Sequence, residues 1–116
     1  MHASETPQSD HTVLVIANDD NARATLAASL EPYGVRAEQC STFCEAESIA
    51  LNWPCMGILV DLATIIKAKA EEKIVAYTLT GFYPTLRVKT MGTIMIPMAM
   101  SGEAKQDKNE SLAKVI

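Results

Sequence analysis

Met56-Gly57-Ile58-Leu59-Val60-Asp61 is a continuous apolar run that follows Trp53-Pro54 and ends on a carboxylate. Runs of this length and composition are typical of a strand that is buried on both faces of a parallel sheet. In open α/β sheets, functional groups gather in the crevice outside the carboxyl ends of the strands. Asp61 is therefore placed either to meet a metal, a phosphoryl group or a hydroxyl, or to cap the next helix. Its position alone favours neither interpretation.

Segments typical of strands and helices alternate upstream of this run. Apolar residues recur at spacings of three and four over two stretches, which indicates amphipathic helices. Gly34 is placed to end the first helix, and the capping box from Thr42 to Glu45 begins the second. The expected elements are strands at 12–17 and 35–40 and helices at 21–33 and 42–53.

The pattern downstream of Asp61 is less regular. Thr64 is placed to cap a helix, and Pro84 suits the first turn of another. Because strands and helices alternate throughout, the sequence predicts a three-layer α/β sandwich with a five-stranded parallel sheet. The expected elements are helices at 65–72, 85–91 and 111–116, a β-rich strand at 74–80 and a fifth strand at 93–96.

Length and charge bound the class of protein. A chain of 116 residues forms one domain with its own core, and a net charge of −4 argues against direct nucleic-acid binding by this domain. No apolar stretch approaches the ~20 residues that cross a bilayer, and residues 1–11 lack the features of a signal peptide. We expect a disordered leader at 1–11 and a folded domain at 12–116, cut from a longer protein, in the cytoplasm and without membrane association.

Cysteine and histidine offer little for catalysis. His2 and His11 lie near the N-terminus, so neither a zinc site nor a Ser-His-Asp triad is predicted. The spacing of the cysteines does not match a Cys-x-x-Cys redox motif. We expect Cys40, Cys44 and Cys55 to be buried free thiols, and we predict no enzyme activity.

Residues 13–61 resemble, without a gap, the first half of a bacterial response-regulator receiver domain. The resemblance implies a flavodoxin-like sheet in the order 2-1-3-4-5, with the third and fourth helices shortened. Asp61 falls on the phospho-accepting aspartate, and Thr80 is similar to the switch threonine that ends the fourth strand. The other positions that carry the resemblance are Leu26, Leu30 and Gly34 for the first helix, Ala46 and Ile49 for the second, and 94–97 for the fifth strand.

The sequence departs from the receiver pattern where the chemistry would take place. Receivers carry two acidic residues after the first strand, which hold Mg²⁺, but this chain has Ala17 and Asn18 there. Alanine offers no oxygen to an ion that needs octahedral oxygen ligands. The position of the receiver lysine carries Ile96, and Leu62-Ala63-Thr64-Ile65 replaces the usual loop after the acceptor.

These departures lead us to expect a degenerate receiver, or pseudo-receiver, in signal transduction. It would act by binding a protein partner or itself, as a homodimer, rather than by phosphorylation, and it would need no cofactor. We expect Met91 and Met95 to fill the core. The face between the fourth helix and the fifth strand is the predicted interface, with Met98, Met100, Phe82 and Tyr83 as its residues.

The alternative is a working receiver of a two-component phosphorelay. Asp61 would be phosphorylated with the help of a shifted Mg²⁺ site made by Asp19, Asp20 and Asp61, because Asp19 and Asp20 lie one and two residues late. It would then control an output domain after Ile116, for example one that binds DNA or cyclic-di-GMP.

Overall fold

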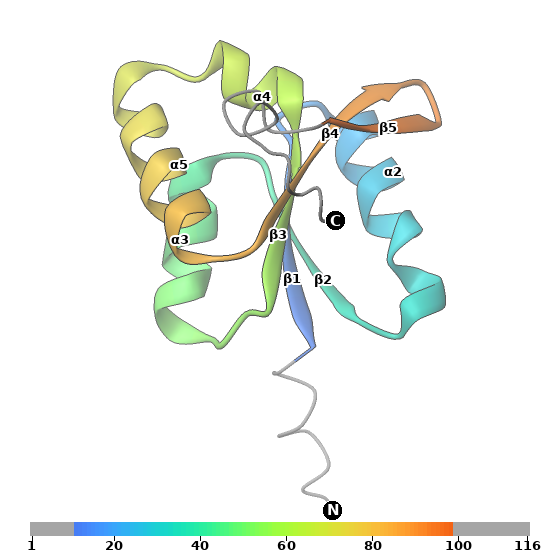
Figure 1. Ribbon diagram of the computed structural model, residues 1–116, viewed down its shortest axis with the longest axis horizontal. Helices are drawn as coiled ribbons and strands as arrows, with labels where there is room; N and C mark the ends of the chain where they lie inside the picture. Colours follow the sequence, from blue (N-terminus) through green and yellow to red (C-terminus); the bar gives the residue numbers. More distant parts are fainter. Residues whose placement is uncertain (1–10, 99–116) are drawn as a thin grey trace, which may run out of the picture.

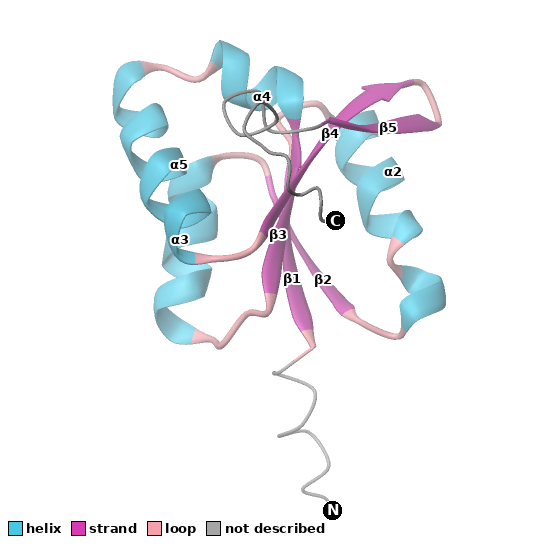
Figure 2. Ribbon diagram, viewed as in Figure 1, coloured by secondary structure: helices cyan, strands magenta, loops and turns pink. Residues whose placement is uncertain are grey.

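A computed structural model describes residues 11–98 of the chain (Figure 1). The leader expected at 1–11 therefore lies almost wholly outside the described residues, as does the helix expected at 111–116. Figure 2 shows the helices and strands of the described part. The strands are β1 (Thr12–Ile16), β2 (Arg36–Cys40), β3 (Gly57–Asp61), β4 (Thr85–Met91) and β5 (Ile94–Met98). The helices are α2 (Asp20–Ser29), α3 (Phe43–Asn52), α4 (Leu62–Lys67), α5 (Ala70–Phe82) and a short 3-10 helix, η1 (Glu31–Tyr33).

The five strands form one sheet in the order β2-β1-β3-β4-β5, which confirms the predicted α/β fold class and strand order. β1 pairs in parallel with β2 and β3, and β3 pairs in parallel with β4. The expectation of an all-parallel sheet is wrong at β5, which runs antiparallel to β4. Only Gly92 and Thr93 separate the two strands, and so short a connection permits only a hairpin. Gly92 has φ 63, which glycine adopts without strain.

Two elements of the second half differ from their predictions. Residues 74–80, expected as a strand, lie inside α5, and 85–91, expected as a helix, form β4. The region between β3 and β4 therefore holds two helices, α4 and α5, and no helix connects β4 with β5. The third helix, α4, is short at 6 residues, as expected, whereas the fourth helix, α5, has 13 residues and lies before β4 rather than after it. Thr64 does not cap a helix either, because α4 begins at Leu62.

Helices cover the sheet on both faces, which makes the three layers (Figure 1). One core cluster joins the sheet to α3 and α5 and includes Phe43, which is fully buried. A second cluster joins the opposite face of the sheet to α2 through Leu26. β3 lies between the two clusters, and all five of its residues are buried, as its apolar run predicted. The side chains of Asp19 and Thr42 cap α2 and α3.

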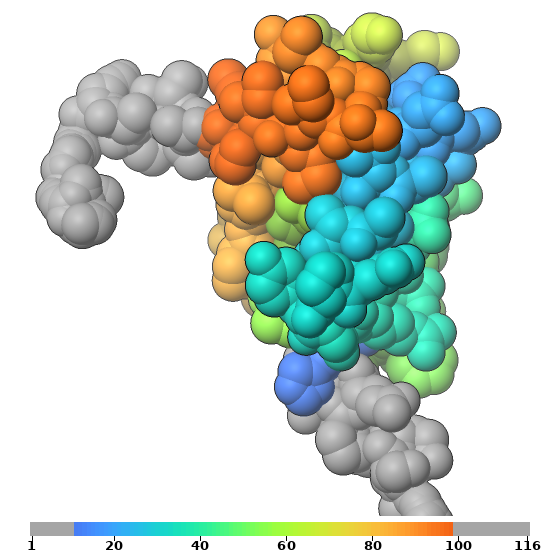
Figure 3. All heavy atoms as spheres, turned by 90° about the vertical axis from the view of Figure 1, so that its right-hand side faces the viewer, coloured from blue at the N-terminus to red at the C-terminus, as the bar shows by residue number. Residues whose placement is uncertain are grey.

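Within residues 11–98, the β4–β5 hairpin is packed on one face, whereas the other face is exposed around the turn and along β5. Val88 and Met95 pack into the cluster beneath α2, and Figure 3 shows the hairpin lying directly against that helix. Residues of the opposite face, Met91, Ile94 and Ile96, are exposed. Pro97 lies opposite Val88 on this outermost strand. Proline has no N–H and is tolerated in a sheet where its nitrogen faces the free edge.

Candidate functional site

Asp61 lies where β3 ends, and its carboxylate is held by two hydroxyl groups. The residue is 3% exposed. Thr64 Oγ1 donates to Oδ2 at 3.2 Å, and Thr90 Oγ1 donates to Oδ1 at 3.1 Å. Asp61 occupies the N-cap position of α4, but its side chain makes no capping hydrogen bond. The carboxylate is thus directed to side chains of α4 and β4 and does not cap the helix that follows it.

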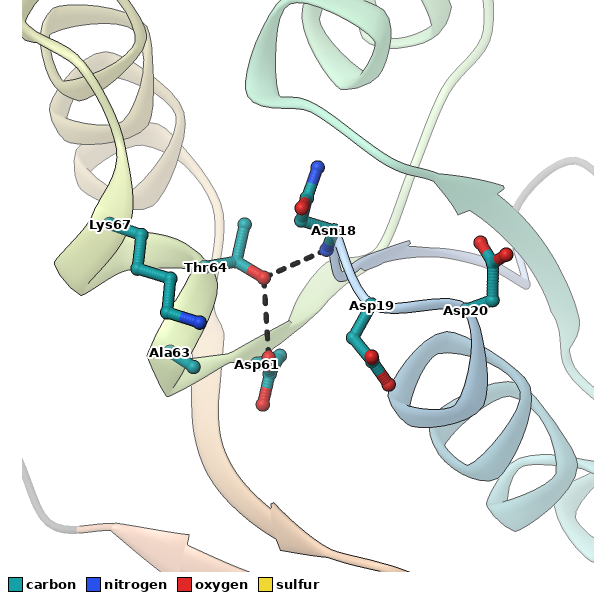
Figure 4. Close-up of a pocket in the computed structure, with 7 residues that line it drawn as sticks. All are labelled: Asn18, Asp19, Asp20, Asp61, Ala63, Thr64 and Lys67. Atoms are coloured by element: carbon teal, nitrogen blue, oxygen red, sulfur yellow. Dashed lines mark hydrogen bonds between the residues drawn. The ribbon is translucent and has the colours of Figure 1, made fainter.

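Thr64 links Asp61 to the loop after β1. Its hydroxyl oxygen also accepts a hydrogen bond of 2.8 Å from the backbone N–H of Asn18, from the opposite side of the site (Figure 4). One hydroxyl therefore donates to the carboxylate and accepts from the loop. This arrangement satisfies the part-buried N–H of Asn18 and the buried carboxylate of Asp61 together, and it links α4 to the end of β1.

Asp19 and Asp20 are engaged in other interactions. Asp19 Oδ2 accepts a hydrogen bond of 2.9 Å from the backbone N–H of Ala22 and so caps α2. Asp20 is exposed and forms an ion pair of 2.6 Å with Arg23. No three Asp, Glu, His or Cys side chains in the described range come together in the manner of a metal site. Ala17, at the end of β1, is fully buried and offers no ligand.

A pocket of about 310 Å³ opens above the carboxylate. The ammonium of Lys67, on α4, points into it beside Asp61 (Figure 4). The pocket thus joins a positive side chain with several acidic ones, and its polar lining can hold water or a small ion. Its lining residues are Asn18, Asp19, Asp20, Asp61, Ala63, Thr64 and Lys67.

Thr80 and Ile96 do not lie where the receiver resemblance placed them. Thr80 lies within α5, so it does not end the fourth strand; Thr90, near the end of β4, contacts Asp61 instead. Ile96, aligned with the receiver lysine, lies on the antiparallel strand and pairs with Lys89. Lys67 lines the pocket beside Asp61 and was not among the predicted site residues. The alternation of apolar and polar residues in 85–89 is a signal for strand β4, but it does not identify Thr90 as a partner of Asp61.

The predicted interface residues do not share one surface element. Phe82 ends α5 and is 76% exposed; its ring meets that of Tyr83 edge-on, with the centroids 4.9 Å apart. Tyr83 packs partly against the core. Met98 is half-buried in β5, and Met100 lies outside the described residues. The expected helix between them does not exist, so the predicted helix-and-strand face is wrong as described.

The methionines before the hairpin turn and in β5 differ in burial. Met95 packs against the core cluster under α2, as expected. Met91 was expected to fill the core too, but it is exposed. The turn at Gly92 places Met91 on the face of the hairpin that no described helix covers.

The thiols are poorly suited to nucleophilic or redox chemistry. Cys40, Cys44 and Cys55 are all free, as expected, but only Cys40 is buried. Burial, with Glu45 and Glu38 nearby, raises the pKa of Cys40 to about 12. A hydrogen bond with Glu72 is the main cause that raises the pKa of Cys44 to about 11. Both thiols stay protonated at neutral pH, and the thiolate is the reactive form.

The N-terminus of α3 already has an anionic partner within the chain. Glu72 of α5 accepts hydrogen bonds from the backbone N–H groups of Phe43, at 2.6 Å, and Cys44, at 3.2 Å. Free N–H groups at a helix start attract anions, and a carboxylate meets that preference here. Glu72 therefore joins α5 to α3 above the core.

None of the helices in residues 11–98 is long and apolar enough to cross a membrane. Comparisons of the chain with models of protein families, with curated proteins and with solved structures found no match. The candidate site is therefore interpreted from its own geometry.

Proposed function

We propose that this domain is a degenerate receiver-type module of cytoplasmic signalling that binds a protein partner and does not accept a phosphoryl group. The observation that supports this most is the state of the Asp61 carboxylate, which is buried and accepts a hydroxyl hydrogen bond on each oxygen. Phosphorylation needs a free carboxylate oxygen in line with the donor and charge neutralisation around the moving group. A hydroxyl donor on each oxygen lowers the nucleophilicity of the carboxylate and leaves only the remaining lone pairs for attack.

The surroundings of Asp61 support the same proposal. The side chain after β1 is Ala17, which has no carboxylate, and Asp19, which lines the pocket, has one of its two carboxylate oxygens engaged in the cap of α2. Exposed apolar side chains on two separate elements, α5 and the hairpin, favour binding as the mode of action, because exposed apolar patches usually mark interfaces.

The second candidate is a working receiver, and the pocket is the observation in its favour. Lys67 and Asp19 line the same pocket as Asp61, and Thr90 contacts the carboxylate from the end of the fourth strand. Those are the kinds of side chain that phosphoryl transfer uses. The candidate requires a carboxylate that turns away from its two threonines when a metal ion and a phosphoryl donor arrive.

Incubation with Mg²⁺ and a small phosphoryl donor, followed by intact-mass spectrometry, separates the two candidates. We expect no gain of a phosphoryl group by the wild-type chain, and the same result for Asp61→Asn. A known active receiver in the same tube provides the positive control. A phosphoryl adduct on the wild type that Asp61→Asn abolishes would refute the binding-only proposal and establish the second candidate.

A further inference from the structure

The face of the β4–β5 hairpin that is turned away from α2 combines apolar side chains with basic ones. In an antiparallel pair, residues directly opposite each other share one face of the sheet. Val88 and Met95 pack under α2, so the residues that alternate with them lie on the other face. The six side chains there form the hairpin face, in the pairs Arg87–Met98, Lys89–Ile96 and Met91–Ile94.

The hairpin face is open to solvent, and its charge is of one sign. Ile94 is 61% and Met91 54% exposed. Residues 85–98 hold two basic residues and no acidic one, although the net charge of the chain is −4. Within residues 11–98, no acidic side chain forms an ion pair with Lys89. Figure 1 shows the hairpin standing out from the rest of the sheet, where a partner can reach it.

We propose that the hairpin face binds an acidic amphipathic helix of another protein. The proposal rests on the proposed function, because it specifies the chemistry of the protein partner. The apolar row on β5 takes the apolar stripe of the helix, and the ammonium of Lys89 meets a carboxylate beside that stripe. Charge complementarity of this kind selects an acidic partner over a neutral or basic one.

The spacing of the apolar row suits a helix. Side chains on one face of a strand lie two residues apart, which is about 6.8 Å along the strand. Four residues of an α-helix rise about 6 Å, so apolar residues four apart on a helix come into step with Ile94, Ile96 and Met98. An added strand fits less well, because Pro97 has no N–H to donate at the free edge of β5.

The chain itself matches this chemistry less well than an acidic partner does. Residues 99–116 hold three acidic and three basic residues, so they bring no net negative charge. In α3, which carries two glutamates, Leu51 is the only large apolar residue that is exposed. In α5, which has exposed apolar residues, both glutamates lie in the first turn, and Glu72 is bound to α3. Charge complementarity therefore favours another protein over this chain or a second copy of it.

Fluorescence anisotropy of a labelled peptide, titrated with the full chain, tests the proposal. The probe is a helical peptide of about 16 residues with leucines four residues apart and glutamates on both sides of them. A second peptide has lysine in place of every glutamate. Two short strands make a small, transient interface, so we expect a dissociation constant on the order of 10 μM for the glutamate peptide. The lysine peptide should bind roughly tenfold more weakly or less.

Each kind of side chain on the face has a variant and a matched control. Ile94→Asp should weaken binding of the glutamate peptide roughly tenfold or more, whereas Ile74→Asp on α5, where Ile74 is 66% exposed, should leave it unchanged. Lys89→Glu should weaken the glutamate peptide roughly tenfold and strengthen the lysine peptide, whereas the exposed Lys69→Glu should change neither. Circular dichroism should report the same secondary structure for all variants.

The proposal is overturned if the glutamate peptide shows no saturable binding up to roughly 1 mM, or if the two peptides bind equally. Equal losses in Ile94→Asp and Ile74→Asp, or an unchanged peptide preference in Lys89→Glu, would overturn it too. Two further results would give the face to another occupant and so refute it. One is a dimer in sedimentation equilibrium that Ile94→Asp dissociates. The other is a loss of unfolding free energy in Ile94→Asp as large as that of a core truncation, which would place the same chain there.

The phosphorylation assay reads out Asp61 independently of the peptide titration. A chain that neither takes up a phosphoryl group nor binds the glutamate peptide refutes only this choice of surface and partner. A chain that binds the peptide and also takes up a phosphoryl group refutes only the binding-only function.

Discussion

The strands β2, β1 and β3 and the hairpin β4–β5 belong to one sheet but are stabilised differently. Helices cover both faces of the first group, and β3 is buried along its whole length. The hairpin is packed under α2 through Val88 and Met95, and its other face is exposed at Ile94 and Ile96. The difference indicates that the first three strands carry most of the stability, while the hairpin is held by a few contacts that include Thr90 with Asp61.

Truncation of one apolar side chain in each region should give the largest contrast. Phe43 is fully buried between α3 and the sheet, and Phe43→Ala should lower the free energy of unfolding by about 3–5 kcal/mol. Ile94→Ala on the exposed face of the hairpin should change it by less than ~0.5 kcal/mol. Urea denaturation measures both. A loss at Ile94 as large as that at Phe43 would show that the exposed face is covered in solution.

The contact that joins the hairpin to the first group should have an intermediate effect. Thr90→Val keeps the shape but removes the donor to Asp61, and hydrogen bonds to a charged group contribute about 1.5–3 kcal/mol. Thr25→Val is the control, because the Thr25 hydroxyl reaches the same hairpin only through a long, exposed bond of 3.5 Å to Gly92. We expect Thr25→Val to lower the free energy of unfolding by less than ~0.5 kcal/mol. Equal losses would show that the contact with Asp61 does not hold the hairpin.

The smallest predicted effect is on the pH dependence of the free energy of unfolding, and it comes from the buried thiol of Cys40 in β2. The pKa of Cys40 is raised from 9.0 to about 12, chiefly by burial, so the folded state keeps a proton that the unfolded chain loses. The stabilisation is fully present below pH 9.0 and is lost as the pH rises from 9.0 toward 12. The unfolding free energy of the wild type should therefore fall more steeply between these limits than that of Cys40→Ala. Parallel curves would contradict the burial of this thiol.

Local patterns predicted the first group of strands and its helices because each pattern agrees with burial in the fold. The apolar run ending at Asp61 and the capping box at Thr42 specify their elements without knowledge of distant contacts. The second half differs. Residues 74–80 contain β-branched and aromatic residues, which suggested a strand, but Ala76 and Leu79 pack on the core at helical spacing. Tertiary packing outweighed propensity there.

The sequence analysis predicted neither the β4–β5 hairpin nor the contact of Thr90 with Asp61. Leu86 and Val88 alternate with Arg87 and Lys89, which is typical of a strand. Pro84, however, is typical of the first turn of a helix, and the helix was predicted instead. Asp61 could be found from its own run of residues. Its partner Thr90 could not, because that contact depends on the register between β3 and β4, twenty-nine residues apart in sequence.

Pro97 restricts what the outermost strand can bind. A strand from another molecule that added to β5 would find no amide donor at Pro97 and would meet the proline ring in its place. Fibril growth by extension of the sheet is therefore opposed at this edge, even though the neighbouring side chains are apolar and exposed.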